Sequence, residues 1–137
     1  MGRIVENLNI ETVLAPASVS ATTDTTSGYV DASGAEEVAF IVSTAPLGAG
    51  KTLTVTLMGA NDSEGDGAAA IGDAVTFTDA VGTEPQAAVV SYRVDPQKAR
   101  YLAVKFQHNA AAAVICSAAA ASKSRYRPAQ NPWVVLM

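Results

Sequence analysis

Apolar and polar side chains alternate along much of the chain from residue 36 onward. The clearest run is 52–58, where threonine alternates with leucine and valine, a pattern typical of a half-buried strand. Further β-rich runs predict strands at 36–44, 74–78, 87–94 and 100–107. Because these short strands are separated by turn-rich stretches with no helices between them, they predict an all-β fold. We expect one antiparallel β-sandwich, jelly-roll-like, with extended N- and C-terminal arms.

Residues 110–122 fit two kinds of element. Alanine, which dominates this segment, is the best helix former, whereas Val114, Ile115 and Cys116 favour a strand. The segment has neither a clear helix cap nor an amphipathic stripe, so a strand is the prediction.

The two ends differ from the middle of the chain. Residues 1–28 show little periodicity, and the last eleven residues contain two prolines and finish apolar. The predicted division is an N-terminal arm and first edge strand at 1–28, a β-sandwich at 29–128 and a C-terminal apolar arm at 129–137. The last arm either folds back onto its own sandwich or reaches a neighbouring subunit.

Composition suggests that part of the surface is covered by a partner. Of 137 residues, 49% are apolar, but only 6% are aromatic and 16% charged, against about 25% charged in an average domain. Much of the apolar fraction is alanine, which buries little area, so the core must come from scattered Val, Ile, Leu and Phe. A chain this lightly charged is more apolar than a free monomer needs.

Charge is unevenly distributed along the chain. Residues 1–92 contain two basic and twelve acidic residues, a net charge of −10, whereas residues 93–137 contain seven basic and one acidic, a net charge of +6. This asymmetry either aligns neighbouring copies or reflects basic residues solvated at strand edges. An overall net charge of −4 and the lack of interleaved aromatics argue against a nucleic-acid partner.

The N-terminal segment is too polar for a signal peptide, since Glu6, Asn7, Asn9 and Glu11 interrupt it. We expect synthesis in the cytoplasm, without a membrane partner. The single cysteine, Cys116, excludes an internal disulfide and is expected to act as a small core hydrophobe.

Three segments resemble chemical motifs, and each has a simpler interpretation. Residues 45–52 end in Gly50-Lys51-Thr52 like a phosphate-binding loop, but a strand pattern follows where a helix is needed, so we predict a hairpin loop. Residues 62–67 with Asp73 approach calcium-loop spacing inside the loop 61–73, although strand-like flanks favour a plain acidic loop. The only histidine, His108, is predicted to lie in a turn without catalytic duty, so no catalytic, cofactor or metal site is expected.

The order of these patterns resembles small structural proteins of tailed bacteriophages and prophages over most of residues 20–128. The segments that carry the resemblance are 26–31, the strand at 36–44, 57–63, 92–94, 99–104 and the alanine-rich strand ending at Arg127-Pro128. The resemblance implies a virion β-sandwich without enzymatic activity, of the head decoration or cement type, bound to the outer face of the capsid shell. It supplies no residue-level site.

The expected function is therefore a non-enzymatic virion protein that binds the major capsid protein and copies of itself, with a trimer among the possible oligomers. The expected partner-binding residues lie in the arms and at the basic C-terminal segment: Arg3, Ile4, Val5, Leu8, Lys123, Arg125, Arg127, Trp133, Val134, Val135 and Leu136. The alternatives are a neck or tail component of the virion and a carbohydrate- or calcium-binding module that uses loops 61–73 and 79–86.

Overall fold

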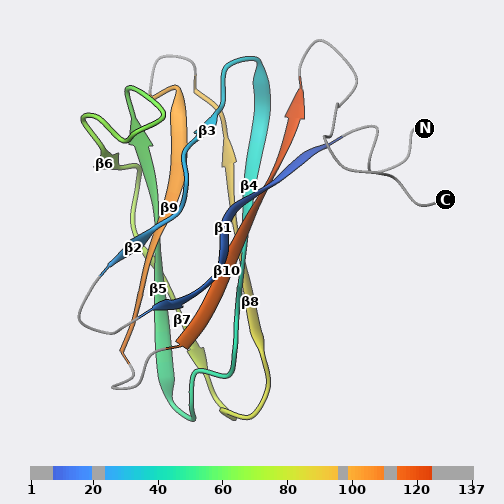
Figure 1. Ribbon diagram of the computed structural model, residues 1–137, viewed down its shortest axis with the longest axis vertical. Helices are drawn as coiled ribbons and strands as arrows, with labels where there is room; N and C mark the ends of the chain where they lie inside the picture. Colours follow the sequence, from blue (N-terminus) through green and yellow to red (C-terminus); the bar gives the residue numbers. More distant parts are fainter. Residues whose placement is uncertain (1–7, 20–23, 96–98, 110–113, 125–137) are drawn as a thin grey trace, which may run out of the picture.

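A computed structural model of the protein describes residues 8–19, 24–95, 99–109 and 114–124, and every helix or strand among them is a β-strand (Figure 1). The strands are β1 (Asn9–Val19), β2 (Thr25–Thr26), β3 (Val30–Asp31), β4 (Ala35–Thr44), β5 (Lys51–Ala60), β6 (Ala69–Ala70), β7 (Val75–Asp79), β8 (Gln86–Arg93), β9 (Tyr101–His108) and β10 (Val114–Ser124). These residues contain no helix long and apolar enough to cross a membrane.

The strands form two antiparallel sheets that face each other, so the predicted fold class is confirmed. One sheet has the order β1-β10-β4-β8, and the other places β2 and β3 beside β9, then β5, then β6 and β7. Early strands therefore pair with late ones: β1 with β10, β2 and β3 with β9, and β4 with β8. This nested pairing, closed by β5 with β6 and β7, is the topology of a jelly roll.

All five strands predicted from alternation are present as β4, β5, β7, β8 and β9, and the alanine-rich segment forms the strand β10. The segment predicted as an arm and first edge strand contains β1, which lies at the edge of its sheet beside β10. The chain division at residues 28 and 128 stays a prediction.

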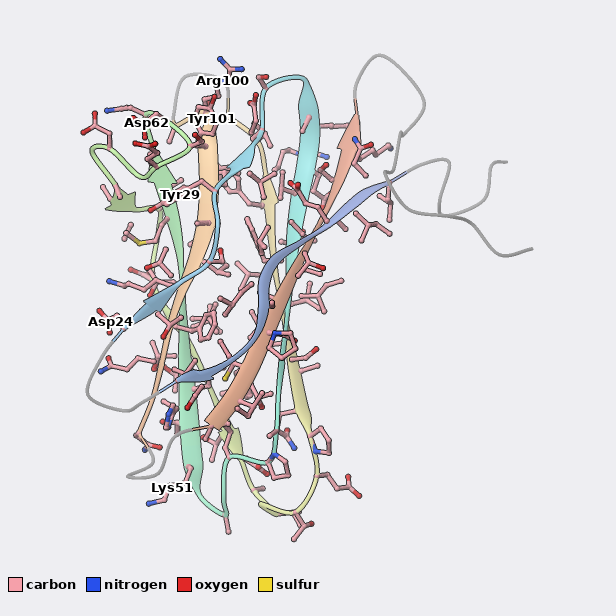
Figure 2. All side chains as sticks on the ribbon, in the orientation of Figure 1. Asp24, Tyr29, Lys51, Asp62, Arg100 and Tyr101 are labelled. Carbon is pink, nitrogen blue, oxygen red and sulfur yellow. The ribbon has the colours of Figure 1, made fainter. Side chains whose placement is uncertain are left out.

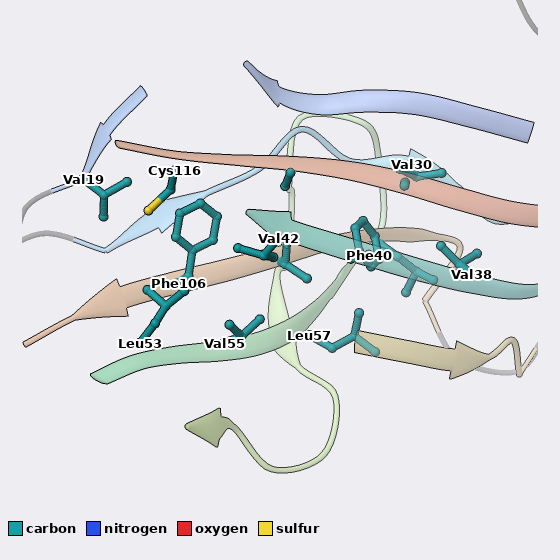
Figure 3. Close-up of a cluster of buried hydrophobic side chains, with 14 of the residues drawn as sticks. Val19, Val30, Val38, Phe40, Val42, Leu53, Val55, Leu57, Phe106 and Cys116 are labelled. Carbon is teal, nitrogen blue, oxygen red and sulfur yellow. The ribbon is translucent and has the colours of Figure 1, made fainter. Parts of the chain in front are cut away.

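The core lies between the sheets and is built from few large side chains (Figure 3). Phe40 of β4 and Phe106 of β9 are the largest fully buried residues, and smaller aliphatic side chains surround them. In β5 the leucine and valine positions are buried while the intervening threonines remain partly exposed, as the alternation predicts. The twofold period of the sequence thus separates a thin core from two outer sheet faces.

The connection between β4 and β5 is not a hairpin, which corrects the prediction for residues 45–52. Strand β4 already pairs with β10 on one side and β8 on the other, so β5 has no free edge there and joins the opposite sheet. Gly48 and Gly50 both take positive φ angles in this crossing, and strand β5 starts at Lys51 without a helix.

Asp79, at the end of β7, fixes this crossing from the inside. Its buried carboxylate accepts one backbone hydrogen bond from Leu47 at 3.0 Å and another from Gly82 at 2.8 Å. Gly82 has a φ of 83° and lies so near the crossing that a Cβ there would come within 2.2 Å of the Ala49 nitrogen. One carboxylate therefore joins the β4–β5 connection to the turn after β7.

Replacing Asp79 tests this role. We expect Asp79→Ala to lower the free energy of unfolding by about 3 kcal/mol, because two amide donors lose their acceptor, one of them on a buried residue. Chemical denaturation measures the loss, with Asp73→Ala at an exposed loop carboxylate as the control. A loss no larger than in the control would contradict the assignment.

Candidate functional site

The outer face of the β1-β10-β4-β8 sheet carries exposed aliphatic side chains among alanine and serine residues. Ile115 of β10, Ile41 of β4 and Val89 of β8 are exposed by 50%, 39% and 63%. Ala119 lies directly opposite Ile41, which lies opposite Val89, so one row of apolar side chains crosses three strands. We call this surface the alanine face; its members are Ala39, Ile41, Ala87, Val89, Ile115, Ala119 and Ala121.

A charged row borders the alanine face at one end. Lys123 of β10 lies opposite Glu37 of β4, which lies opposite Arg93 of β8. The Lys123 ammonium also lies 3.8 Å from a carboxylate oxygen of Glu36. Lys123, one of the predicted partner-binding residues, therefore lies beside an exposed apolar surface.

The start of β1 and the end of β10 lie near this row. Leu8, also predicted to bind a partner, is partly buried and directly precedes β1, whose first residue Asn9 pairs with Ser122. The start of β1 and the end of β10 consequently lie side by side (Figure 1). The other predicted partner-binding residues lie outside the described residues: Arg3, Ile4, Val5, Arg125, Arg127, Trp133, Val134, Val135 and Leu136.

The outer face of the opposite sheet is polar. Thr52 and Thr54 of β5 lie opposite Thr78 and Thr76 of β7, and the Thr54 and Thr76 hydroxyl oxygens are 3.0 Å apart. On the other side of β5, a hollow of about 160 Å³ is lined by Asp24, Thr54, Thr56, Lys105, Phe106 and Gln107. The two outer faces therefore offer different chemistry, apolar on one and hydroxyl-rich on the other.

An ion pair holds the start of β9 to β3 at one end of the sandwich. The Arg100 guanidinium donates two hydrogen bonds to the Asp31 carboxylate at 2.9 and 2.7 Å and lies 5.3 Å from the Tyr101 ring centre (Figure 2). This guanidinium lowers the pKa of Asp31 to about 2, and the carboxylate raises the pKa of Arg100 further above its ordinary value. The pair fastens β3 to the start of β9, a structural role.

The acidic loop folds around its own carboxylate. The Asp62 side chain accepts backbone hydrogen bonds from Glu64 at 2.9 Å and Asp66 at 3.0 Å, and these bonds lower the pKa of Asp62. Among the described residues no cluster of three or more acidic, histidine or cysteine side chains is arranged to hold a metal ion. The neighbouring hollow of about 510 Å³ has Asn61 as its one polar side chain among glycine, alanine and isoleucine.

His108 does not lie in a turn, which corrects that prediction. It is the last residue of β9, it is 2% exposed, and its ring nitrogen Nε2 hydrogen-bonds the carbonyl of Val19. Cys116 is also buried, and this burial raises its pKa to about 11, so the thiol packs in the core as predicted.

Sequence comparisons find no match to this chain among protein-family models or curated proteins. Solved structures that resemble it include three at 12% identity. The whole of this chain aligns with 44% of PBSX exported protein XepA (TM-score 0.58). The chain thus spans less than half the length of XepA. A carbohydrate-binding module of Ruminococcus flavefaciens FD-1 Cel9A (TM-score 0.52) aligns over 99% of its length with 85% of this chain. The CBM22-1-GH10 modules of Clostridium thermocellum xylanase 10B (TM-score 0.50) align over 28% of their length with 97% of this chain. These similarities show a shared β-sandwich fold.

The Asp31–Arg100 pair makes stability depend on acidity. Because the pKa of Asp31 falls from 3.8 to about 2 on folding, its contribution is complete above 3.8 and disappears as the pH falls through about 2. Both side chains are partly exposed, so we expect a contribution of about 0.5–1 kcal/mol. Asp31→Asn should remove this part of the pH dependence of unfolding, whereas Asp73→Asn should retain it. Equal acid sensitivity in the two variants would contradict the role of Asp31.

Proposed function

We propose that the chain is a non-enzymatic structural protein of a tailed-phage or prophage virion, a decoration protein that binds the major capsid protein and copies of itself on the head shell. The observation that carries this proposal is the alanine face. Three large aliphatic side chains stand exposed on a background of alanine, so a flat protein surface can approach closely. Covering apolar area is worth about 25 cal/mol per Å² before the costs of association.

Stabilisation in this role comes from many copies acting together. A face that bridges neighbouring shell subunits must be released before those subunits separate, so binding to the assembled state raises its stability. Lys123, Leu8, the start of β1 and the end of β10 lie beside the alanine face, which supports the expectation that the arms add contacts there.

A neck or tail position remains the alternative within the virion, because the same face suits any protein shell. A second candidate from another class is carbohydrate binding. It is favoured by the hydroxyl-rich outer face of β5 and β7 and its hollow of about 160 Å³. Jelly rolls occur in both viral capsid and lectin domains, so the topology is compatible with either function.

Substitution on the alanine face tests the leading proposal. We expect Ile115→Lys to weaken co-sedimentation with capsid shells at least about tenfold, because a charge would have to be desolvated in the contact. The matched control is Val75→Lys, a valine of similar exposure (58%) on β7 of the other sheet. The shells come from the phage or prophage that encodes the chain, and isolated necks and tails are compared in parallel.

Each outcome of this experiment separates the candidates. Binding to necks or tails in place of shells would move the protein within the virion. Failure of the wild-type chain to bind any virion part would overturn the proposal, and retention on insoluble polysaccharide would then favour the carbohydrate-binding alternative. Equal loss in both variants would remove the alanine face from the contact.

Deletion of residues 129–137 tests the C-terminal arm. This deletion removes Trp133, Val134, Val135 and Leu136, and we expect it to lower the occupancy of the chain on particles while the folded sandwich remains stable. The readout is the ratio of this chain to capsid protein in purified particles, with thermal unfolding as the folding control. Unchanged incorporation would show that the arm makes no contact with the shell.

A further inference from the structure

The β-sandwich has two open sides, and the edge strands there differ in how well they are protected. On one side lie β1 and the two-residue strands β2 and β3, and on the other lie β8, the five-residue β7 and the two-residue β6. An edge strand presents unpaired backbone N–H and C=O groups. A strand of another chain can hydrogen-bond to them unless the edge is short, bulged or blocked by proline or charge. Only the longer edges, β1 and β8, are long enough to template an additional strand.

Strand β1 carries the features that prevent such pairing. Two register shifts interrupt its ladder with β10, one between Thr12 and Leu14 and one between Leu14 and Ala17. Pro16, inside the second shift, has no N–H to donate. Bulges and proline are common protections of an edge, so β1 is a poor template.

Strand β8 carries none of these features. It pairs with β4 at eight successive positions from Glu37–Arg93 to Thr44–Gln86 without a register shift, and it contains neither proline nor lysine. Its only charged residue is the terminal Arg93, and at its centre Val89 is 63% exposed. An eight-residue, regular and apolar edge is an efficient template for another strand.

We infer that β8 pairs antiparallel with β8 of a second copy of this chain, joining two β1-β10-β4-β8 sheets into one continuous sheet across a twofold axis. Strand alternation limits the registers, because residues on the same face must lie opposite each other. In the register centred on Val89, this valine lies opposite its own counterpart and Ala87 lies opposite Ser91. Two copies of Arg93 then lie at opposite ends of the paired strands, so like charges do not meet.

Two further observations fit this register. Arg93 of one copy lies opposite Pro85 of the other, next to the exposed Glu84, which is a complementary charge. On the inner face Tyr92 lies opposite Gln86 of the second copy, so no like charges meet there either.

The pairing would add to the proposed structural role. Its consequence for particle assembly rests on that proposed function. Val89 and Ile41 belong to the alanine face, so the joined sheet would bring two alanine faces side by side in one plane. One dimer would then present twice the apolar surface of a single copy, which favours contacts that span neighbouring subunits.

Charge substitution at Val89 tests the twofold pairing. Because Val89 lies opposite itself, Val89→Glu and Val89→Lys each place like charges opposite one another, and we expect either to raise the dimer dissociation constant at least about tenfold. An equimolar mixture of the two variants should restore the dimer, since opposite charges then meet. Analytical ultracentrifugation measures the populations, and Val81→Glu, at a loop valine exposed by 70%, should remain dimeric.

Restoration by mixing also proves that both variants fold. A wild-type chain that sediments as a monomer, or a mixture that fails to pair while each variant unfolds like the wild type, would overturn the β8 pairing. A monomer that still binds shells would refute this inference and leave the proposed function standing. A dimer that binds no part of the virion would refute the proposed function and retain the pairing.

Discussion

The insertion of β10 between β1 and β4 is the interaction on which the rest of the structure depends. It places the last strand of the described residues between β1 and β4, and so closes the jelly roll. Alternate residues of β10 enter the core as Val114, Cys116, Ala118 and Ala120, while Ile115 and Ala119 between them belong to the alanine face. The small side chains of this central strand contribute both to the thin core and to the alanine background of the outer face.

The strands that alternate strictly could be predicted from the sequence, and those whose pattern is interrupted could not. β5 and β9 place threonine, lysine or glutamine on one face and aliphatic or aromatic residues on the other, which is sufficient to identify them. In β1 the two register shifts move side chains between faces, so period two is lost although eleven residues are extended. The two-residue strands have no period to detect, and their positions depend on distant partners such as Phe106 and Leu102.

Local pattern also cannot name the partner of a strand. The glycine-rich connection before Lys51 has the composition of a hairpin, but the neighbours of β4 are distant in sequence and occupy both of its edges. The same limitation applies to the candidate surfaces. Alternation indicates which face of its own strand each of Ile41, Val89 and Ala119 occupies. Their alignment into one row across three strands follows only from the register between the strands. The burial of His108 could not be predicted from local pattern either, since its ring at the end of β9 hydrogen-bonds a carbonyl 89 residues away in the sequence.

Part of the uneven charge of the sequence is paired inside the fold. Each ion pair in the described residues joins a basic residue of the C-terminal third to an acidic residue of the first part: Arg100 to Asp31, Lys105 to Asp24 and Lys123 to Glu36. Because jelly-roll pairing places late strands between early ones, a basic late segment beside an acidic early segment brings opposite charges together within one molecule. Charges that are paired in this way are less able to align separate copies. The contacts that remain for assembly are the alanine face and the edge of β8, where shape and backbone register would determine which surfaces meet.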